Sequence, residues 1–128
     1  MTSKRCPFCE ISQDRVLHEA KLVKAIWDRF PASPGHVLII PHRHVVTWFD
    51  ANREEQRELL EAIEHVRLIL EKQFSPSGYN IGMNVGAAAG QTVFHLHLHV
   101  IPRYAGDVAD PTGGIRNVIP GKANYRGE

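Results

Sequence analysis

Three histidines alternate with apolar residues in the last third of the chain, at His95, His97 and His99. Successive side chains of a β-strand point to opposite faces, so this spacing predicts three imidazoles on one face and an apolar opposite face. Neighbouring imidazoles would then lie roughly 7 Å apart along the backbone. A neutral imidazole has one bare ring nitrogen, which can bind a metal ion or attack an electrophile.

This histidine face is open to three interpretations. The imidazoles could hold a catalytic metal ion, as alternating histidines on strands can. One of them could attack phosphorus directly while the others orient it and bind the developing charge. The third interpretation is a solvated polar face, which is the weakest because histidine has only moderate strand preference and is costly to bury without a partner.

The loop that precedes the histidines favours phosphate chemistry. Its glycines at Gly86 and Gly90 allow a close backbone approach, and the side chains of Gln91 and Thr92 can donate hydrogen bonds to phosphate oxygens. No Asp or Glu occurs between residues 84 and 99, which argues against a site for hard divalent cations. The segment is therefore typical of a phosphate-binding loop made of neutral donors.

One long amphipathic helix is predicted over residues 52–74, with Asp50 or Asn52 as its cap and acidic residues in its first turn. Its apolar stripe at helical spacing is expected to cover a sheet. The stripe consists of Leu59, Ile63, Val66, Leu70 and Phe74.

The rest of the chain predicts short strands over residues 22–27, 36–40, 79–84 and 93–101, and a short helix or turn over 6–13. This order favours antiparallel pairing over repeated crossovers, so the predicted fold class is α+β. Residues 105–128 are rich in Gly and Pro and have no core of their own. We therefore expect one domain, 1–104, with a C-terminal tail, 105–128, packed on the domain or on a partner.

Composition excludes several functional classes. The chain has 128 residues, which favours a single domain. Its 15 Lys and Arg against 14 Asp and Glu give a net charge of +1, so no strong field favours a nucleic-acid polymer or an anionic membrane. No signal peptide and no apolar run near the roughly 20 residues of a membrane span is seen. A cytoplasmic location and a small phosphate-bearing ligand are expected.

Cys6 and Cys9 form a Cys-x-x-Cys pair, and two cysteines this close in sequence cannot cross-link distant parts of the fold. In a reducing compartment this spacing indicates metal or redox chemistry. The alternative is that both cysteines are merely small, half-buried residues.

Together these motifs resemble the histidine triad (HIT) family of nucleotide hydrolases and transferases, in its zinc-bearing bacterial-type branch. The signature alternates three histidines with apolar residues, and residues 95–101 match it fully. The segments 34–41 and 90–93 resemble the family's Gly-His strand and phosphate loop, and the similarity covers roughly residues 6–104.

The resemblance implies a nucleotidyl hydrolase or transferase that cleaves P–N bonds or acid anhydrides through a nucleotidyl-histidine intermediate. Its substrate would be a nucleoside phosphoramidate, a dinucleoside polyphosphate or a related conjugate. The implied catalytic residues are His97 as nucleophile with His99, His36 and Thr92. The implied substrate-binding residues are Phe8, Ile11, Ile26, Asp28, Asn84, Gly90, Gln91, Thr92 and His99.

The resemblance also implies a closed structural zinc site on Cys6, Cys9, His44 and His95, with no organic cofactor. His42 is the alternative to His44. It implies a five-stranded antiparallel sheet with one long helix and a short N-terminal helix. A homodimer is expected, with the helix 52–74 at or near the contact.

Two other functions remain open at this point. A metal-dependent hydrolase would use His95, His97 and His99 as ligands. A nucleotide-binding or scaffold protein would bind a nucleotide at this site without turning it over.

Overall fold

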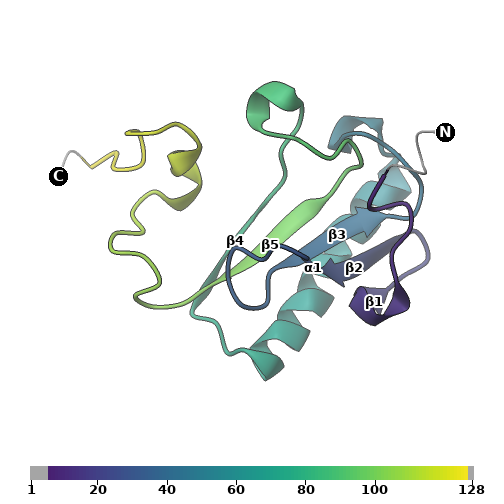
Figure 1. The fold of residues 1–128 in the computed structure, drawn as a ribbon, viewed down its shortest axis with the longest axis horizontal. Coiled ribbons are helices and arrows are strands. Elements are labelled where there is room, and N and C mark those ends of the chain that lie inside the picture. Colours follow the sequence, from purple (N-terminus) through teal and green to yellow (C-terminus); the bar gives the residue numbers. More distant parts are fainter. Residues whose placement is uncertain (1–5, 127–128) are drawn as a thin grey trace.

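The computed structural model describes residues 6–126 and contains a five-stranded antiparallel sheet with one long helix packed on one face (Figure 1). The strands lie in the order β1-β2-β3-β5-β4, and every neighbouring pair is antiparallel. The predicted α+β fold is therefore confirmed. The elements are β1 (Val16–Glu19), β2 (Val23–Trp27), β3 (Val37–Pro41), α1 (Arg53–Gln73), β4 (Gly78–Gly82) and β5 (Leu98–Arg103).

The N-terminus of helix α1 is stabilised by a capping box formed by Asn52 and Glu55. The Asn52 side chain accepts a hydrogen bond from the backbone N–H of Glu55, and the Glu55 carboxylate accepts one from that of Asn52. This reciprocal pair satisfies two of the free donors at the helix start. The stripe toward the sheet is the predicted one, except that Ala62 is buried while Ile63 and Phe74 are only partly buried.

Two strands differ from the sequence prediction. The half-buried strand β1 was not predicted as a segment, because it lacks a clear alternation and has a bulge between Val16 and His18. Strand β5 begins at Leu98, five residues later than expected. The chain before it is held by the loop after β3 instead, through the Leu96 N–H donating to the Val45 carbonyl.

The two faces of the sheet carry different cores. The face under α1 packs Val23, Ile39 and Leu98 against the helix stripe. The opposite face carries a smaller cluster formed by Phe8, Ile26, Leu38 and Ile40. No α-helix of the described chain covers this second face, which carries His97 and His99. The short N-terminal helix is a single 3₁₀ turn, Gln13–Arg15, and the segment before it contains a turn at residues 7–9.

The C-terminal segment departs from the sheet after β5 and contains a 3₁₀ helix, Gly114–Val118, on the left of Figure 1. Arg103 and Asp107 form a bidentate ion pair at its start. Among the residues described, no helix is long and apolar enough to cross a membrane.

Candidate active site and metal centre

The backbone fixes the ring orientation of His97. Its Nδ1–H donates to the carbonyl oxygen of His95 at 2.8 Å, so the neutral ring leaves Nε2 without a proton. The ring is half-buried and lies 5.1 Å from the ring of His99, centroid to centroid. This arrangement offers one bare nitrogen beside a second imidazole.

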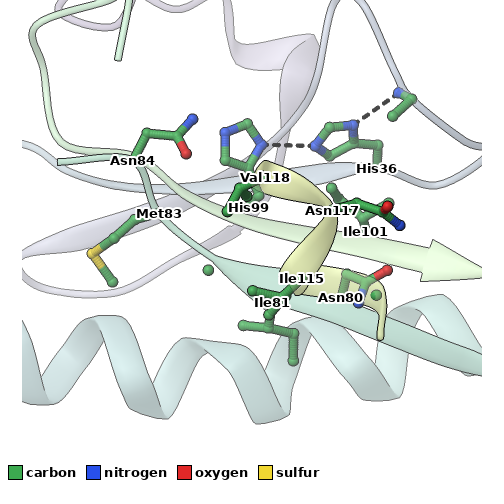
Figure 2. A pocket seen from close by; sticks show the side chains of 13 residues that line it. His36, Asn80, Ile81, Met83, Asn84, His99, Ile101, Ile115, Asn117 and Val118 are labelled. Carbon is green, nitrogen blue, oxygen red and sulfur yellow. Dashed lines mark hydrogen bonds between the residues drawn. The ribbon is translucent and has the colours of Figure 1, made fainter. Parts of the chain in front are cut away.

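A chain of hydrogen bonds fixes the tautomers of the next two histidines (Figure 2). The backbone N–H of Ala32 donates to His36 Nδ1 at 2.9 Å, which leaves the ring proton of His36 on Nε2. His36 Nε2 then donates to His99 Nδ1 at 3.0 Å. The ring proton of His99 must therefore sit on Nε2, where it is a donor.

Burial keeps this pair neutral. Desolvation lowers the pKa of His36, although the carboxylate of Asp28, 3.4 Å from His36 Nε2, opposes it. Desolvation, followed by the neighbouring rings of His97 and His36, lowers the pKa of His99 to about 4. Near neutral pH, His99 is a neutral hydrogen-bond donor whose orientation is set by His36.

The loop before the triad makes a tight turn between its two glycines. A 3₁₀ turn, Ala87–Ala89, lies between Gly86 and Gly90, which have positive φ angles of 90° and 99°. A side chain at either position would be strained in that backbone conformation. The glycines therefore fix the turn that brings Thr92 to the histidines.

The sequence predicts that the Gln91 side chain is free to donate to a phosphate, but in the structure it is not. It is buried, its Nε2 donates to the carbonyls of Val46 and Val93, and its Oε1 accepts from the N–H of Gly86. Its polar atoms are already used in holding the loop together. Thr92, by contrast, is exposed and lines a cavity together with His97.

That cavity, which we call the base-side pocket, has a volume of about 270 Å³. Of the residues implied for substrate binding, Phe8, Asp28, Thr92 and His99 line it. Ile26 is fully buried behind it, and Ile11 packs with Ile26 in the same cluster, so neither reaches the cavity. Sequence reasoning missed several lining residues, which come together only through the fold: Pro7, Arg15, Arg29, Phe30, Leu38 and Val93.

Four metal-binding side chains meet on the other side of Phe8. His44 Nδ1 and His95 Nδ1 are 3.2 Å apart, and Cys9 Sγ lies 3.2 Å from the first and 3.6 Å from the second. Cys6 Sγ is 3.4 Å from His95 Nδ1. Tetrahedral zinc requires about 3.3 Å between two nitrogens and about 3.6 Å between nitrogen and sulfur, so the donor set fits zinc.

The surroundings orient this cluster for a metal. His95 is fully buried and its Nε2–H donates to the carbonyl of Pro41, which leaves Nδ1 bare toward the sulfurs. Burial and the neighbouring Cys6 thiol raise the pKa of Cys9 to about 11, so ionising the pair requires a compensating cation. His42 points elsewhere, to the carbonyl of Ala20, so the structure favours His44 over His42.

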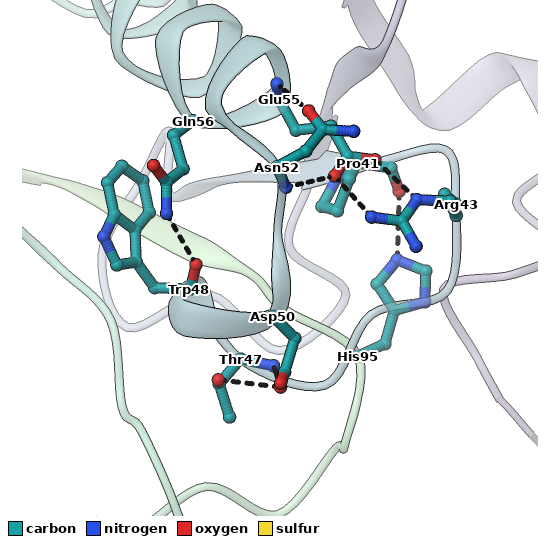
Figure 3. Close-up of polar contacts among 9 residues, drawn as sticks. All are labelled: Pro41, Arg43, Thr47, Trp48, Asp50, Asn52, Glu55, Gln56 and His95. Carbon is teal, nitrogen blue, oxygen red and sulfur yellow. Dashed lines mark hydrogen bonds and ion pairs between the residues drawn. The ribbon is translucent and has the colours of Figure 1, made fainter.

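The loop that carries His44 is anchored to the start of α1 (Figure 3). Arg43 donates two hydrogen bonds, of 2.8 and 3.0 Å, to the buried carboxylate of Glu55. These bonds and the backbone N–H of Asn52 hold the pKa of Glu55 below its ordinary value, although burial opposes them. The Glu55 carboxylate therefore stabilises both the N-terminus of α1 and the loop that carries His44.

The three triad rings do not converge on a common point. His95 turns its free nitrogen to the cysteines, and His97 and His99 each use Nδ1 in a different hydrogen bond. Within residues 6–126, the potential metal-binding groups are the cysteine cluster and a set of Asp28, His36 and His99. The second set is explained without a metal ion, because His36 Nε2 donates to His99 and lies 3.4 Å from the Asp28 carboxylate. The interpretation of the triad as a catalytic metal site thus loses its geometric basis.

The sheet, the alternating histidines and the cysteine cluster define a class of small α+β proteins, and comparison with known proteins identifies it. The family model described as HIT domain matches residues 10–106. The chain belongs to the HIT domain family.

Three relatives illustrate the range of the family. The chain is 36% identical over 122 residues to AP-4-A phosphorylase of Mycobacterium tuberculosis, covering 89% of this chain and 62% of that protein. It is 41% identical over 96 residues to bis(5'-nucleosyl)-tetraphosphatase [asymmetrical] of Schizosaccharomyces pombe, covering 75% of this chain and 53% of that protein. A zinc-bound histidine triad family protein from Mycobacterium smegmatis has a TM-score of 0.75 and 32% identity, covering 84% of this chain and 81% of that one.

Proposed function

We propose that this protein is a nucleotidyl hydrolase or transferase that cleaves nucleotide conjugates at the α-phosphorus through a covalent intermediate on His97. One observation carries the proposal: the His95 carbonyl holds the proton of His97 on Nδ1, so that Nε2 is bare beside the neutral donor His99. A nucleophile held in its reactive tautomer by the backbone needs no metal ion to activate it.

The reaction divides into two displacements. The lone pair of His97 Nε2 forms a bond to phosphorus, and the bond from phosphorus to the leaving group breaks with its electron pair. The leaving group takes up a proton from the solvent. Water then attacks the same phosphorus, the bond to His97 breaks, a proton is released, and the products are a nucleoside monophosphate and free enzyme. In a transferase, another acceptor replaces the water.

Several neutral groups are available to stabilise the charge on the phosphoryl oxygens. His99 offers Nε2–H, and we propose that Thr92 Oγ1, Asn84 Nδ2 and the backbone at Gly90 face the same oxygens. Each such donor contributes about 2 to 4 kcal/mol to stabilising the transition state. Gln91 contributes indirectly, because its amide shapes the loop.

The substrate class rests on the base-side pocket and on the relatives. The pocket opens beside His97 and His99 and is lined by Phe8, Leu38 and Asp28, which suits a nucleoside with its ribose near the carboxylate. The names of the relatives support dinucleoside polyphosphates and similar nucleotide conjugates as the wider class.

We also propose that the cysteine cluster binds structural zinc. The ion would neutralise the two thiolates and join the N-terminal turn to the loop after β3 and to His95. It would supply no chemistry to the reaction, because its four ligand positions are filled by protein.

The proposal is tested by trapping the intermediate. Adenosine 5'-phosphoramidate is mixed with the protein and quenched in alkali, and an acid-labile adenylyl adduct on His97 is expected by peptide mass spectrometry. His97→Gln should lose the adduct and lower kcat by at least about 10⁴-fold. His65→Asn, on the exposed side of α1, is the matched control. Nucleotide binding without turnover by the wild type would instead favour a binding or scaffold protein.

A further inference from the structure

The loop between β2 and β3, residues 28–36, supplies the hydrogen bond that sets the protons of the histidine pair. The Ala32 N–H donates to His36 Nδ1, and His36 in turn determines which nitrogen of His99 carries a proton (Figure 2). The loop contains no helix or strand, and its two prolines have no backbone N–H to donate. Contacts with other elements therefore have to hold it in place.

Two side-chain hydroxyls join this loop to the end of β5. The Ser33 hydroxyl donates to the carbonyl oxygen of Pro102 at 2.6 Å, and the Tyr104 hydroxyl donates to that of Pro34 at 2.7 Å. Ser33 and Tyr104 are half-buried, and Pro102 is buried. The two hydrogen bonds run in opposite directions between the same two segments. Together they fix the loop against the strand that carries His99.

The backbone pairing of β3 with β5 does not reach this part of the loop. The register joins Val37 to Val100, and the loop precedes Val37 in the chain. Pro102 and Tyr104 lie beyond Val100, so no residue of β3 is opposite them. The two hydroxyls thus make the connection that the backbone ladder makes further along the sheet.

The other side of the loop packs against the end of α1. A Cβ at Gly35 would meet Phe74 Cδ2 at 3.1 Å and Leu70 Cδ2 at 3.3 Å. The ring of Phe74 also lies edge-on to that of Trp27, the last residue of β2, with their centroids 6.0 Å apart. The helix therefore limits movement of the loop on one side, and the two hydroxyls limit it on the side of β5.

The other neutral tautomer of His36 would reverse both rings. With its proton on Nδ1, His36 would present a bare Nε2 to His99 Nδ1, which would then have to carry the proton. His99 Nε2 would become an acceptor where the proposed reaction needs a donor. The Asp28 carboxylate, 3.4 Å from His36 Nε2, favours the observed tautomer, and its other oxygen accepts from the Phe30 N–H. Both influences on His36 therefore depend on the position of the loop.

We propose that Ser33 and Tyr104 are positioning residues, whose hydroxyls hold the loop against β5 so that the Ala32 N–H stays on His36 Nδ1 and His99 stays a donor at Nε2. The inference rests on the proposed function. Ser33 and Tyr104 are not among the residues that line the base-side pocket. Their loss should therefore lower kcat through the orientation of His99 and leave nucleotide binding nearly unchanged.

The tautomers are measured by ¹⁵N NMR of protein labelled in its histidine rings, because protonated and bare ring nitrogens have different shifts. In the wild type, His36 and His99 should both be protonated at Nε2, with the signals assigned from His36→Gln and His99→Gln. In the double variant Ser33→Ala, Tyr104→Phe, the Nε2 signal of His99 should shift toward that of a bare nitrogen. With adenosine 5'-phosphoramidate, kcat should fall by at least about 10-fold while KM changes by less than about 2-fold.

Two further variants separate positioning from a general loss of stability. Ser33→Thr keeps a hydroxyl, so in the Tyr104→Phe background it should retain more of kcat than Ser33→Ala does. Tyr79→Phe is the matched control, because it removes a tyrosine hydroxyl that donates to Glu71 on α1, away from the loop. It should leave both the ring shifts and kcat unchanged.

A wild type with a bare His99 Nε2 would overturn the positioning role, as would a double variant that keeps both its ring shifts and its kcat. A fall in kcat or Tm without any change in the ring shifts would overturn it as well. If the double variant does not fold, Ser33→Ala and Tyr104→Phe are judged singly by the same shifts. Absence of the His97 adduct in the wild type would instead overturn the proposed function, whereas the ring shifts still decide whether the two hydroxyls set the tautomers.

Discussion

The ring of Phe8 lies edge-on to the imidazole of His97, with their centroids 5.0 Å apart and their planes at 64°. Phe8 stands between Cys6 and Cys9 in the chain, and its ring also contacts His95 at 6.0 Å. The metal cluster and the proposed nucleophile therefore share one neighbour. Loosening the cluster should move a wall of the base-side pocket.

Zinc removal is expected to affect both stability and substrate binding. Cys9→Ser should lower zinc content from one equivalent to well below it, and Tm by roughly 10 °C, because metal binding to a folded site contributes to folding. KM for the nucleotide should rise more than kcat falls, since Phe8 borders the pocket but does not take part in the reaction. Metal analysis, thermal unfolding and steady-state kinetics measure these effects.

His42→Ala is the matched control for the metal site, because this neighbouring histidine lies outside the cluster. It should retain zinc and leave KM unchanged. Full zinc occupancy in Cys9→Ser would refute the assignment of the cluster.

Gln91 and Thr92 should respond differently although they are adjacent. Gln91→Ala would leave the Gly86 N–H and the carbonyls of Val46 and Val93 without their partner, which costs about 1 to 3 kcal/mol of stability. Thr92→Ala removes an exposed hydroxyl, so it should leave Tm unchanged and lower kcat by about 10² to 10³-fold. Denaturant unfolding and kcat measured on both variants separate the two roles. Equal loss of stability in both would contradict the distinction.

Glu55 should stabilise the metal cluster indirectly, because its carboxylate holds Arg43, the neighbour of His44 in the chain. Glu55→Ala removes one of the two hydrogen bonds of the capping box and both acceptors of Arg43, so Tm should fall by about 5 °C and zinc affinity should weaken as the His44 loop loosens. Glu54→Ala, in the same helical turn but exposed, provides the comparison and should change neither quantity. Thermal unfolding with competitive zinc chelation measures both.

Stability should fall on mild acidification because His99 is neutral when folded. The groups that face it are His97, His36 and Asp28, and its pKa of about 4 lies below the ordinary value of 6.5. The unfolded chain binds this proton first, so stability is full above pH 6.5 and is lost as the pH falls toward 4, by about 3 kcal/mol. In His99→Gln the unfolding free energy should decline less over this interval. An equal decline would assign the effect to other groups.

A homodimer remains a prediction. Leu60 and Leu68 on α1 are 54% and 57% exposed, and a pair of large apolar side chains on one helix suits a contact with a second copy. Sedimentation should give the mass of two chains, and Leu60→Glu combined with Leu68→Glu should give that of one. A monomeric wild type would refute the expectation.

The sequence by itself determined the elements whose signals are local. The period of α1, its Asn52 cap and the alternation of His95, His97 and His99 depend on residues a few positions apart, so they could be read from the chain. The four predicted ligands, Cys6, Cys9, His44 and His95, came from the resemblance, and the structure brings these residues together.

Only the tertiary structure decided what depends on contacts between distant segments. The inward turn of Gln91, the exclusion of Ile26 from the base-side pocket and the late start of β5 follow from pairing with the loop after β3 and from packing on the second face. The tautomers of His36 and His97 depend on which backbone group lies beside each ring, and that of His99 depends on the ring of His36. Side-chain periodicity indicates which face a residue occupies, but hydrogen-bond partners are chosen by the folded chain, because every buried polar atom needs one.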